Sequence, residues 1–174
     1  MDKRELRVIA RSKIRQLSSE YKQNSSRIIA DKVINLKEYQ KAQNIFIYLS
    51  TSNEPDTKLI IKKCLEDGKN VYIPKCIEQK MYAVKYTDNL KENKYGILEP
   101  VDLFDTIKVD KIDVAVIPCL MASLDNRRLG HGKGYYDYFL NKEIFKLCLC
   151  FKELLSDEIV MDEHDIYMDL VVHE

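Results

Sequence analysis

A short glycine-rich segment carries the strongest chemical signal in the sequence. Three of the five glycines, Gly130, Gly132 and Gly134, lie close together, and Arg128 and Lys133 lie beside them. Because glycine has no Cβ, the backbone N–H groups of such a segment can turn inward around an anion. The two cations add positive charge, and a helix expected directly after the segment would point its positive N-terminal end at the same place. These residues therefore predict a phosphate-binding loop.

The loop matches neither of two common nucleotide-binding patterns. A Walker A loop requires Ser or Thr after its lysine, whereas Lys133 is followed by Gly134. The dinucleotide fingerprint GxGxxG requires glycine where Tyr135 stands. A glycine-rich surface turn without function would account for the glycines alone. The interleaved charges of Arg128, Lys133 and Asp137 favour a phosphate site instead.

Apolar runs and cap signals predict the elements that position this loop. Runs typical of strands cover residues 45–49, 71–73, 81–86, 114–117, 147–151 and 170–172. Pro74 and Pro118 are expected to end two of them. Helical spacing or caps mark residues 6–17, the stretch from Ser18 to Leu36, residues 57–65 before Gly68, and residues 135–140.

Strands that alternate with helices indicate an α/β fold. We expect a single domain over residues 1–174, with three α/β/α layers around a largely parallel, Rossmann-like sheet. In such sheets, ligands bind beyond the carboxyl ends of the strands. The glycine loop falls there because it follows the strand that ends at Pro118.

Composition and charge disfavour several classes of function. The 174 residues include 28 Lys and Arg against 28 Asp and Glu, so the chain lacks the positive surplus that nucleic-acid binding requires. A nucleic-acid module would explain only the basic stripe of Arg4, Arg7, Arg11 and Arg15. We find no signal peptide and no apolar run of about 18 residues, so we expect no membrane segment. Five cysteines without a CxxC pair predict reduced thiols and a cytoplasmic protein.

Residues 128–140, RLGHGKGYYDYFL, resemble the signature RLGxGKGYYDxFL of the 5-formyltetrahydrofolate cyclo-ligase family. Shorter segments follow the order of this family along nearly the whole chain: 3–7, 48–50, 54–57, 73–75, 95–100 and 164–169. Ahead of the signature, the chain departs from the family pattern PGLAFDxxG. Cys119 replaces the first glycine, Ala122 the phenylalanine, Ser123 the aspartate and Asn126 the last glycine. The missing phenylalanine bears on folate packing and not on the phosphate loop.

The resemblance implies a reaction and its site residues. Phosphate from ATP passes to the formyl oxygen of 5-formyltetrahydrofolate, the adjacent nitrogen attacks the activated carbon, and phosphate leaves. Lys133 and Arg128 are the implied catalytic residues. The implied ATP contacts are Lys3, Arg4, Glu5, Leu6, Arg7, Arg128, Leu129, Gly130, His131, Gly132, Lys133, Gly134, Tyr135 and Tyr136. The implied folate contacts are Thr51, Glu54, Asp56, His131, Gly132, Lys133, Gly134 and Tyr135.

Mg2+ is the implied cofactor, with Asp137 and Asp165 as its ligands. Two carboxylates suffice, because Mg2+ keeps several waters and takes phosphate oxygens as further ligands. Plainer alternatives stay open: Asp137 can serve the helix N-terminus, Asp165 a surface turn, and Asp56 a helix cap. Residues 3–7 can likewise form a solvated basic face.

The implied partners are two small molecules, ATP and 5-formyltetrahydrofolate, and we expect a monomer. A non-catalytic domain that binds nucleotides or phosphorylated ligands would also explain the glycine loop. A sugar-phosphate isomerase on a related scaffold would explain it equally well. Neither alternative explains the series of shorter segments.

Overall fold

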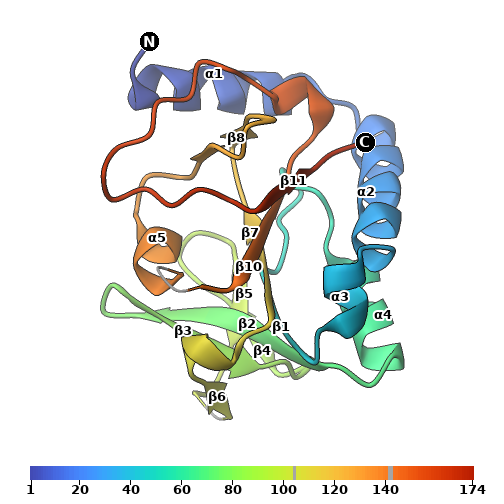
Figure 1. The fold of residues 1–174 in the computed structure, drawn as a ribbon. Coiled ribbons are helices and arrows are strands. Elements are labelled where there is room, and N and C mark those ends of the chain that lie inside the picture. The colour runs from blue at the N-terminus through green and yellow to red at the C-terminus, as the bar shows by residue number, and fades with distance from the viewer. Residues whose placement is uncertain (104, 141–142) are drawn as a thin grey trace.

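A central sheet organises the protein, whose computed structural model describes residues 1–103, 105–140 and 143–174 (Figure 1). Within these residues, its seven strands follow the order β11-β10-β7-β1-β2-β3-β6. Neighbours from β11 to β2 pair in parallel, and β3 and β6 are antiparallel additions. The strands are β1 Asn44–Ile47, β2 Asn70–Ile77, β3 Lys80–Lys85, β6 Thr106–Ile107, β7 Val114–Pro118, β10 Phe145–Leu149 and β11 Leu170–Val172. The predicted largely parallel α/β sheet is confirmed.

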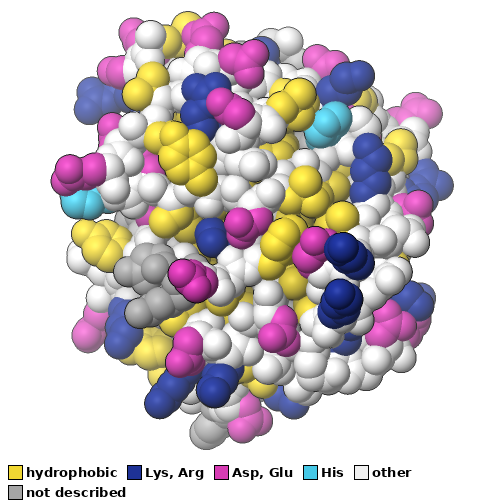
Figure 2. Space-filling model, viewed as in Figure 1, with side chains coloured by type: hydrophobic (Ala, Val, Ile, Leu, Met, Phe, Trp, Pro, Cys, Tyr) yellow, Lys and Arg dark blue, Asp and Glu magenta, His cyan; other side chains and the backbone are white. Residues whose placement is uncertain are grey.

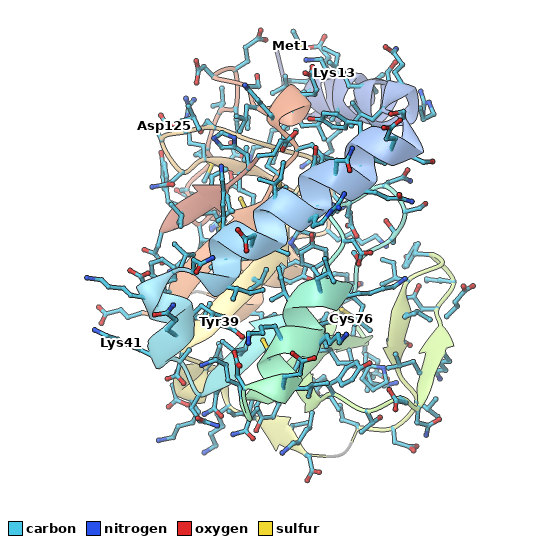
Figure 3. All side chains as sticks on the ribbon, turned by 90° about the vertical axis from the view of Figure 1, so that its right-hand side faces the viewer. Met1, Lys13, Tyr39, Lys41, Cys76 and Asp125 are labelled. Atoms are coloured by element: carbon cyan, nitrogen blue, oxygen red, sulfur yellow. The ribbon has the colours of Figure 1, made fainter. Side chains whose placement is uncertain are left out.

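Helices cover both faces of the sheet and one end of it (Figure 1). On one face lie α2 (Ser19–Ile34), α3 (Lys37–Lys41) and α4 (Lys58–Glu66), and Figure 3 shows this face with α2 and α4 in front of the strands. The short α5 (Tyr135–Phe139) lies on the opposite face, and α1 (Lys3–Gln16) crosses the end of the sheet near β8. The smaller elements are β4 Leu90–Glu92, β5 Leu98–Pro100, β8 Met121–Ala122, β9 Arg128–Leu129, η1 Val109–Lys111 and η2 Lys152–Leu154.

β1 is the buried centre of the fold and fixes α5. Ile45, Phe46 and Ile47 are all 0% exposed, as expected for a strand covered on both faces. Because side chains alternate along a strand, Phe46 points to the opposite face from its two neighbours. Its ring centroid lies 5.1 Å from that of Phe139 and 6.3 Å from that of Tyr136, both on α5. The strand thereby sets the position of the helix that follows the glycine loop.

Local side-chain hydrogen bonds start the first two helices. Asp2 and Glu5 form a reciprocal capping box at α1. Oγ of Ser18 accepts from N of Tyr21, which confirms the predicted cap of α2. Leu36, expected on the inner side of that helix, lies beyond its end as the residue preceding α3. The second helix is therefore shorter than the apolar spacing suggested.

The prediction that Pro74 ends the second strand is wrong. β2 continues through Pro74, which pairs with Ala83 of β3. The ladder between β1 and β2 reaches only Tyr72, so Pro74 lies where β2 has lost its partner on one side. A proline is tolerated there because no ladder bond on that side requires its N–H. Beyond it, Glu78 and Gln79 form the tight hairpin turn with positive φ values of 48° and 67°.

Strand β10 begins and ends two residues earlier than predicted. Its ladder with β7 starts at Phe145 opposite Val114, whereas Cys150 and Phe151 follow its last residue. Phe151 instead precedes the 3-10 turn η2. The apolar run therefore predicted a strand correctly, but its last two residues belong to the loop beyond the strand.

The surface and the thiols agree with the composition. Charged side chains of both signs are interspersed over the face in Figure 2. Within the described chain, the five cysteines are all free. Across the same residues we find no helix with the length and apolar character that a membrane span requires.

Candidate active site

A large cavity opens at the carboxyl end of the sheet, where the loops after β1 and β7 meet. Its volume is about 1540 Å3, and α1, the β4–β5 hairpin and the glycine loop contribute to its walls. Most of the predicted site residues line it: Lys3, Arg7, Thr51, Glu54, Arg128, Leu129, Gly130, His131, Gly132, Lys133, Gly134, Tyr135, Tyr136, Asp137 and Asp165. The fold thus brings distant segments of the sequence to one place.

The glycine loop packs against the basic face of α1. Nε of Arg7 donates to O of Gly130 at 2.9 Å. Gly132 has a φ of +103°, and a Cβ built on it would lie 3.2 Å from Cζ of Arg7. Gly134 also has a positive φ, of +71°, directly before α5. Glycine is therefore required for both the backbone conformation and the close approach of the arginine.

Arg128 supports the glycine loop through buried contacts. Its side chain is 5% exposed, and its Nε donates to O of Pro118 at 2.8 Å. Its guanidinium lies 3.9 Å from Oδ1 of Asp137 and 5.4 Å from the ring centroid of Tyr136. A Cβ on Gly130 would lie 2.9 Å from its nearest guanidinium nitrogen. The buried Arg128 side chain therefore fixes the start of the glycine loop, and its positive charge forms part of the cavity wall.

Lys133 lies at the open side of the cavity against an aromatic ring. Its Nζ is 2.9 Å from the ring centroid of Tyr95, in the turn between β4 and β5. Hydrogen bonding to Lys133 lowers the pKa of the Tyr95 phenol, and hydrogen bonding to Lys94 is the second cause of this shift. Tyr95 belongs to segment 95–100 of the family resemblance, which implies no role for it. An aromatic residue before Gly96 in a turn was the available signal.

The loops after β1 and β7 touch, as their expected position at one edge of the sheet implied. Nε2 of His131 lies 3.5 Å from Oε1 of Glu54. The other oxygen of Glu54 accepts from N of Thr51 at 2.8 Å. The Glu54 side chain is 10% exposed, so its carboxylate is held in place at the cavity wall.

Four predicted contacts lie outside the residues that line the cavity. Glu5 belongs to the capping box of α1, Leu6 is 2% exposed in the core, and Arg4 points to solvent. Oδ1 of Asp56 accepts from N of Lys58 at 2.8 Å, which is the cap at the start of α4. For the three residues on α1 the helical period explains these positions, because it turns only part of a continuous segment toward any one site.

Two arginines that the sequence analysis left unassigned also line the cavity. Arg11 and Arg15 extend the row of Lys3 and Arg7 at intervals of four residues along α1. Residues at this spacing share one face of a helix. This four-residue periodicity could have placed Arg11 and Arg15 at the site. They were not assigned because the family resemblance covers only residues 3–7 of the helix.

The two predicted metal ligands lie close to one another. Oδ1 of Asp137 accepts from N of Ile166 at 3.2 Å, directly after Asp165. Asp165 in turn bonds to Lys3 and to N of Asp162 through its Oδ2. Within the described residues, the second oxygen of each carboxylate has no hydrogen-bond partner. In that part of the chain no cluster of three or more His, Cys, Asp or Glu ligands is found.

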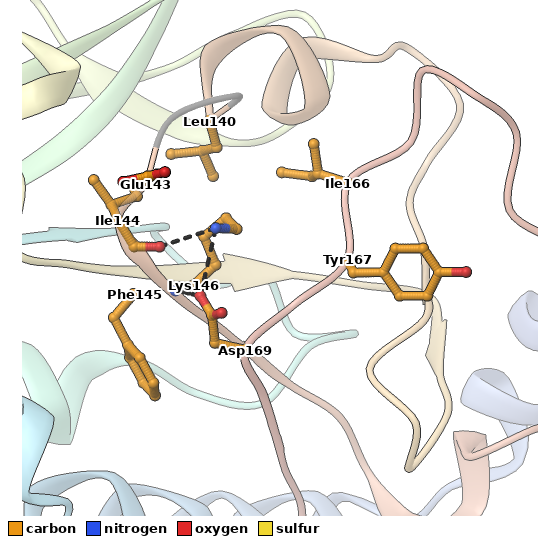
Figure 4. Close-up of a pocket in the computed structure, with 8 residues that line it drawn as sticks. All are labelled: Leu140, Glu143, Ile144, Phe145, Lys146, Ile166, Tyr167 and Asp169. Atoms are coloured by element: carbon orange, nitrogen blue, oxygen red, sulfur yellow. Dashed lines mark hydrogen bonds and ion pairs between the residues drawn. The ribbon is translucent and has the colours of Figure 1, made fainter.

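A smaller pocket of about 610 Å3 lies apart from these residues (Figure 4). Its charged lining residue Lys146 donates to O of Ile144 at 2.9 Å and lies 3.4 Å from Oδ2 of Asp169. Leu140, Ile166 and other apolar groups complete the lining. Lys146 and Asp169 are paired with each other, and Glu143 is a third charged residue of the lining, so we assign no ligand to this pocket.

The whole chain, residues 1–174, matches the model of the 5-formyltetrahydrofolate cyclo-ligase family. The chain belongs to this family. A probable 5-formyltetrahydrofolate cyclo-ligase of Schizosaccharomyces pombe is 34% identical, with 99% of this chain and 95% of the relative covered. The 5-formyltetrahydrofolate cyclo-ligase of Mus musculus is 32% identical, with 99% and 93% covered. The solved structure of Aquifex aeolicus 5,10-methenyltetrahydrofolate synthetase aligns with a TM-score of 0.87 at 26% identity, over 99% of this chain and 89% of that chain.

Family membership confirms the resemblance seen in the sequence. The protein is accordingly a folate ligase of a family that uses ATP and acts on small molecules. Two alternatives lose their support: a non-catalytic binding domain and a sugar-phosphate isomerase. The glycine loop and the shorter segments share one explanation.

Proposed function

We propose that this cyclo-ligase family member converts 5-formyltetrahydrofolate into 5,10-methenyltetrahydrofolate, with ATP cleaved to ADP and phosphate. One observation carries the proposal beyond the family description. The glycine loop and the Glu54 loop line a single cavity and approach to 3.5 Å at His131. The cavity can therefore hold the phosphate donor and its acceptor side by side, with ATP at the glycine loop and the folate at the Glu54 loop.

The glycine loop and α1 form the phosphate end of the proposed site. Backbone N–H groups of the loop, Lys3 and Arg7 surround the position where the ATP phosphates would lie. The formyl oxygen attacks the terminal phosphorus, and the bond to ADP breaks. Negative charge spreads over the transferring phosphoryl oxygens, which Lys133 is placed to neutralise by turning from the Tyr95 ring. Arg128 acts from beneath by fixing the loop.

The loop after β1 forms the folate end. The Glu54 carboxylate can accept hydrogen bonds from the amino and ring N–H groups of the pterin. Thr51 fixes that carboxylate through its N–H. With the formyl oxygen phosphorylated, the neighbouring substrate nitrogen attacks the formyl carbon and loses its proton. The carbon–oxygen bond then breaks, phosphate leaves, and the methenyl ring is closed.

The donor set at Asp137 and Asp165 fits Mg2+. Both carboxylates line the cavity, and each offers one oxygen that has no partner among the described residues. Hard carboxylate oxygens suit Mg2+, which takes its other ligands from phosphates and water. When bound, the ion would neutralise phosphate charge. Asp137 would hold it beside the glycine loop, and Asp165 would have to share its carboxylate with Lys3.

Asp137→Asn should raise the Mg2+ concentration needed for half-maximal activity. The physical reason is that a neutral amide is a poorer ligand for a hard cation than a carboxylate. A magnesium titration of the rate measures this, with Asp162→Asn as the control, because Asp162 also lines the cavity and pairs with Lys3. An unchanged titration would leave Asp137 only as the acceptor for Ile166 N.

Glu54→Gln should weaken folate binding while leaving the melting temperature nearly unchanged. The amide keeps the size of the side chain but has only one acceptor oxygen, and its NH2 group faces a pterin donor in place of the second. Asp56→Ala is the matched variant from the same loop. It should lower stability by about 0.5–2 kcal/mol through loss of the cap, with folate affinity retained. Folate Kd and Tm for both variants decide the matter, and normal folate binding by Glu54→Gln would rule out the Glu54 carboxylate as the pterin contact.

The absorbance of methenyltetrahydrofolate tests the reaction itself. Purified protein is supplied with 5-formyltetrahydrofolate and Mg2+, with and without ATP. We expect product only when ATP is present, with one ADP formed for each product molecule. Product without ATP, or ATP cleavage without product, would overturn the proposal.

The thiol content supports the cytoplasm as the place of action. Cys64, Cys119, Cys148 and Cys150 are buried and free, and Cys76 is half-buried and free. Free thiols in this number are characteristic of a reducing compartment.

A further inference from the structure

Three buried cysteines gather where β7 and β10 end. Pro118 pairs with Leu149 in the parallel ladder, so Cys119 and Cys150 are the next residues along the two strands. Sγ of Cys119 lies 3.3 Å from O of Leu149, the residue between Cys148 and Cys150. The exposed fractions of Cys119, Cys148 and Cys150 are 5%, 0% and 1%. The cluster is therefore shielded from bulk solvent.

Cys119 is the member of this thiol cluster that faces the cavity. It belongs to the cavity lining, whereas Cys148 and Cys150 are not among the described residues that line the cavity. A small solute in the cavity can therefore reach one thiol while the other two stand beside it. Cys119 also occupies a position where the family pattern has glycine, so the cluster is a feature of this chain.

The surroundings favour loss of the proton from Cys119. The neighbouring thiols of Cys148 and Cys150, and then the charge of Arg128, outweigh burial and hold the pKa of its thiol well below the usual value. Hydrogen bonding to Cys119 and burial raise the pKa of Cys148 and of Cys150. The thiolate is the form of cysteine that attacks oxidants. Cys119 is thus the reactive member, and the other two are partner thiols.

We propose that Cys119 is an oxidation site at the floor of the cavity and that it closes a disulfide with Cys148 or Cys150. The oxidant is a small hydroperoxide, and hydrogen peroxide is the probe. The sulfur of Cys119 attacks one peroxide oxygen, the O–O bond breaks, and water leaves, which gives a sulfenic acid. The partner thiol attacks that sulfur, the S–O bond breaks, and a second water leaves with the thiol proton.

The spacing of the strands suits this bond. Neighbouring strands lie about 4.8 Å apart, and a disulfide joins Cα atoms separated by roughly 4.4–6.8 Å. Cys119 and Cys150 follow directly opposite residues, whereas Cys148 lies opposite Ile117, two residues before Cys119. A disulfide between Cys119 and Cys150 can therefore form without opening the sheet.

The backbone around Cys119 links this disulfide to the glycine loop. O of Pro118 accepts from Nε of Arg128 at 2.8 Å, and N of Leu120 donates to O of Leu129 at 2.8 Å. Both neighbours of Cys119 therefore hold β9, which leads into the loop. Pulling Cys119 toward β10 shifts these anchors, and a displacement of about 1 Å in a reacting site can lower the rate by roughly 100-fold.

Peptide mapping of the intact protein after hydrogen peroxide treatment tests the disulfide directly. We expect Cys119 joined to the peptide that contains Cys148 and Cys150, before any change at Cys76. Cys76 is the matched control because it lines the same cavity, while burial raises its pKa. A map without a Cys119 disulfide, or with Cys76 oxidised first, overturns the proposal. This measurement requires no catalytic activity, so its failure is distinct from failure of the proposed function.

Activity after oxidation tests the effect on the site, with each protein compared with its own untreated rate. Wild type and Cys76→Ala should lose activity by about 100-fold and regain it with dithiothreitol. The double variant Cys148→Ala/Cys150→Ala should keep a much larger fraction, because Cys119 then lacks a partner. The single variants identify the partner and replace the double variant if it fails to fold. Full activity in disulfide-bonded wild type, or an equal loss in the double variant, overturns the switch.

Discussion

Lys133→Ala is expected to lower the rate of methenyltetrahydrofolate formation by about 100- to 1000-fold. Removal of one donor that stabilises charge in a transition state typically has an effect of this size. Lys133 lies on the glycine loop and lines the cavity in which we propose that phosphoryl charge develops. The negative charge on the phosphoryl group is greatest in the transition state of its transfer. The variant should therefore lower kcat by a larger factor than it lowers ATP affinity. Steady-state kinetics with both substrates measure the two effects separately.

Lys94→Ala is the matched control for this prediction. Lys94 also lines the cavity, and its Nζ lies 5.1 Å from the same Tyr95 ring that Lys133 contacts. The variant removes an equal charge from the same region but not from the glycine loop, so kcat should change little. Equal losses in the two variants would mean that general positive charge, rather than the position of Lys133, supports catalysis.

Phe46→Ala is expected to lower the free energy of unfolding by about 3–5 kcal/mol. The ring is fully buried and packs against Phe139 and Tyr136, so its removal leaves a cavity beneath α5. Each kcal/mol shifts the Tm of a chain of this size by about 2–4 °C. Chemical denaturation and thermal scans check the stability, and ATP affinity reports on the glycine loop before α5.

Ile45→Ala separates a general loss of stability from a specific loss of ATP affinity. Ile45 is equally buried on the same strand but points to the opposite face, so the loss of stability should be similar, about 2–5 kcal/mol. Its ATP affinity should stay near that of the wild type, whereas Phe46→Ala should bind ATP more weakly under conditions in which both are folded. Equal ATP affinities would show that α5 does not depend on β1 for its position.

Residue type and local spacing were sufficient to predict the parts of the site built from adjacent residues. The three close glycines with their cations predicted the loop, and Gly132 and Gly134 do adopt positive φ values. The order of strand, loop and helix predicted that Glu54 and the glycine loop share one edge of the sheet, which the contact with His131 confirms. These features depend on backbone chemistry and on the direction of parallel strands, both of which the sequence encodes locally.

Features that depend on pairing between distant segments could not be predicted in this way. Pro74 was expected to stop a strand because the sequence does not reveal that β1 has already ended beside it. Likewise, the contact of Tyr95 with Lys133 joins two loops that only the folded sheet brings together. Leu6 was grouped with its polar neighbours because a motif names a continuous segment, whereas a helix divides it between core and cavity.

The pairing of Lys3 with Asp162 and Asp165 has a consequence for synthesis of the protein. These partners are separated by 159 and 162 residues, so the first helix leaves the ribosome long before the carboxylates that hold its end. The entropy of closing so long a segment must be recovered from contacts made late. The central strands can therefore pair while α1 is still undocked. A nascent chain should consequently gain affinity for nucleotide in one late step, after nearly all of its residues have emerged.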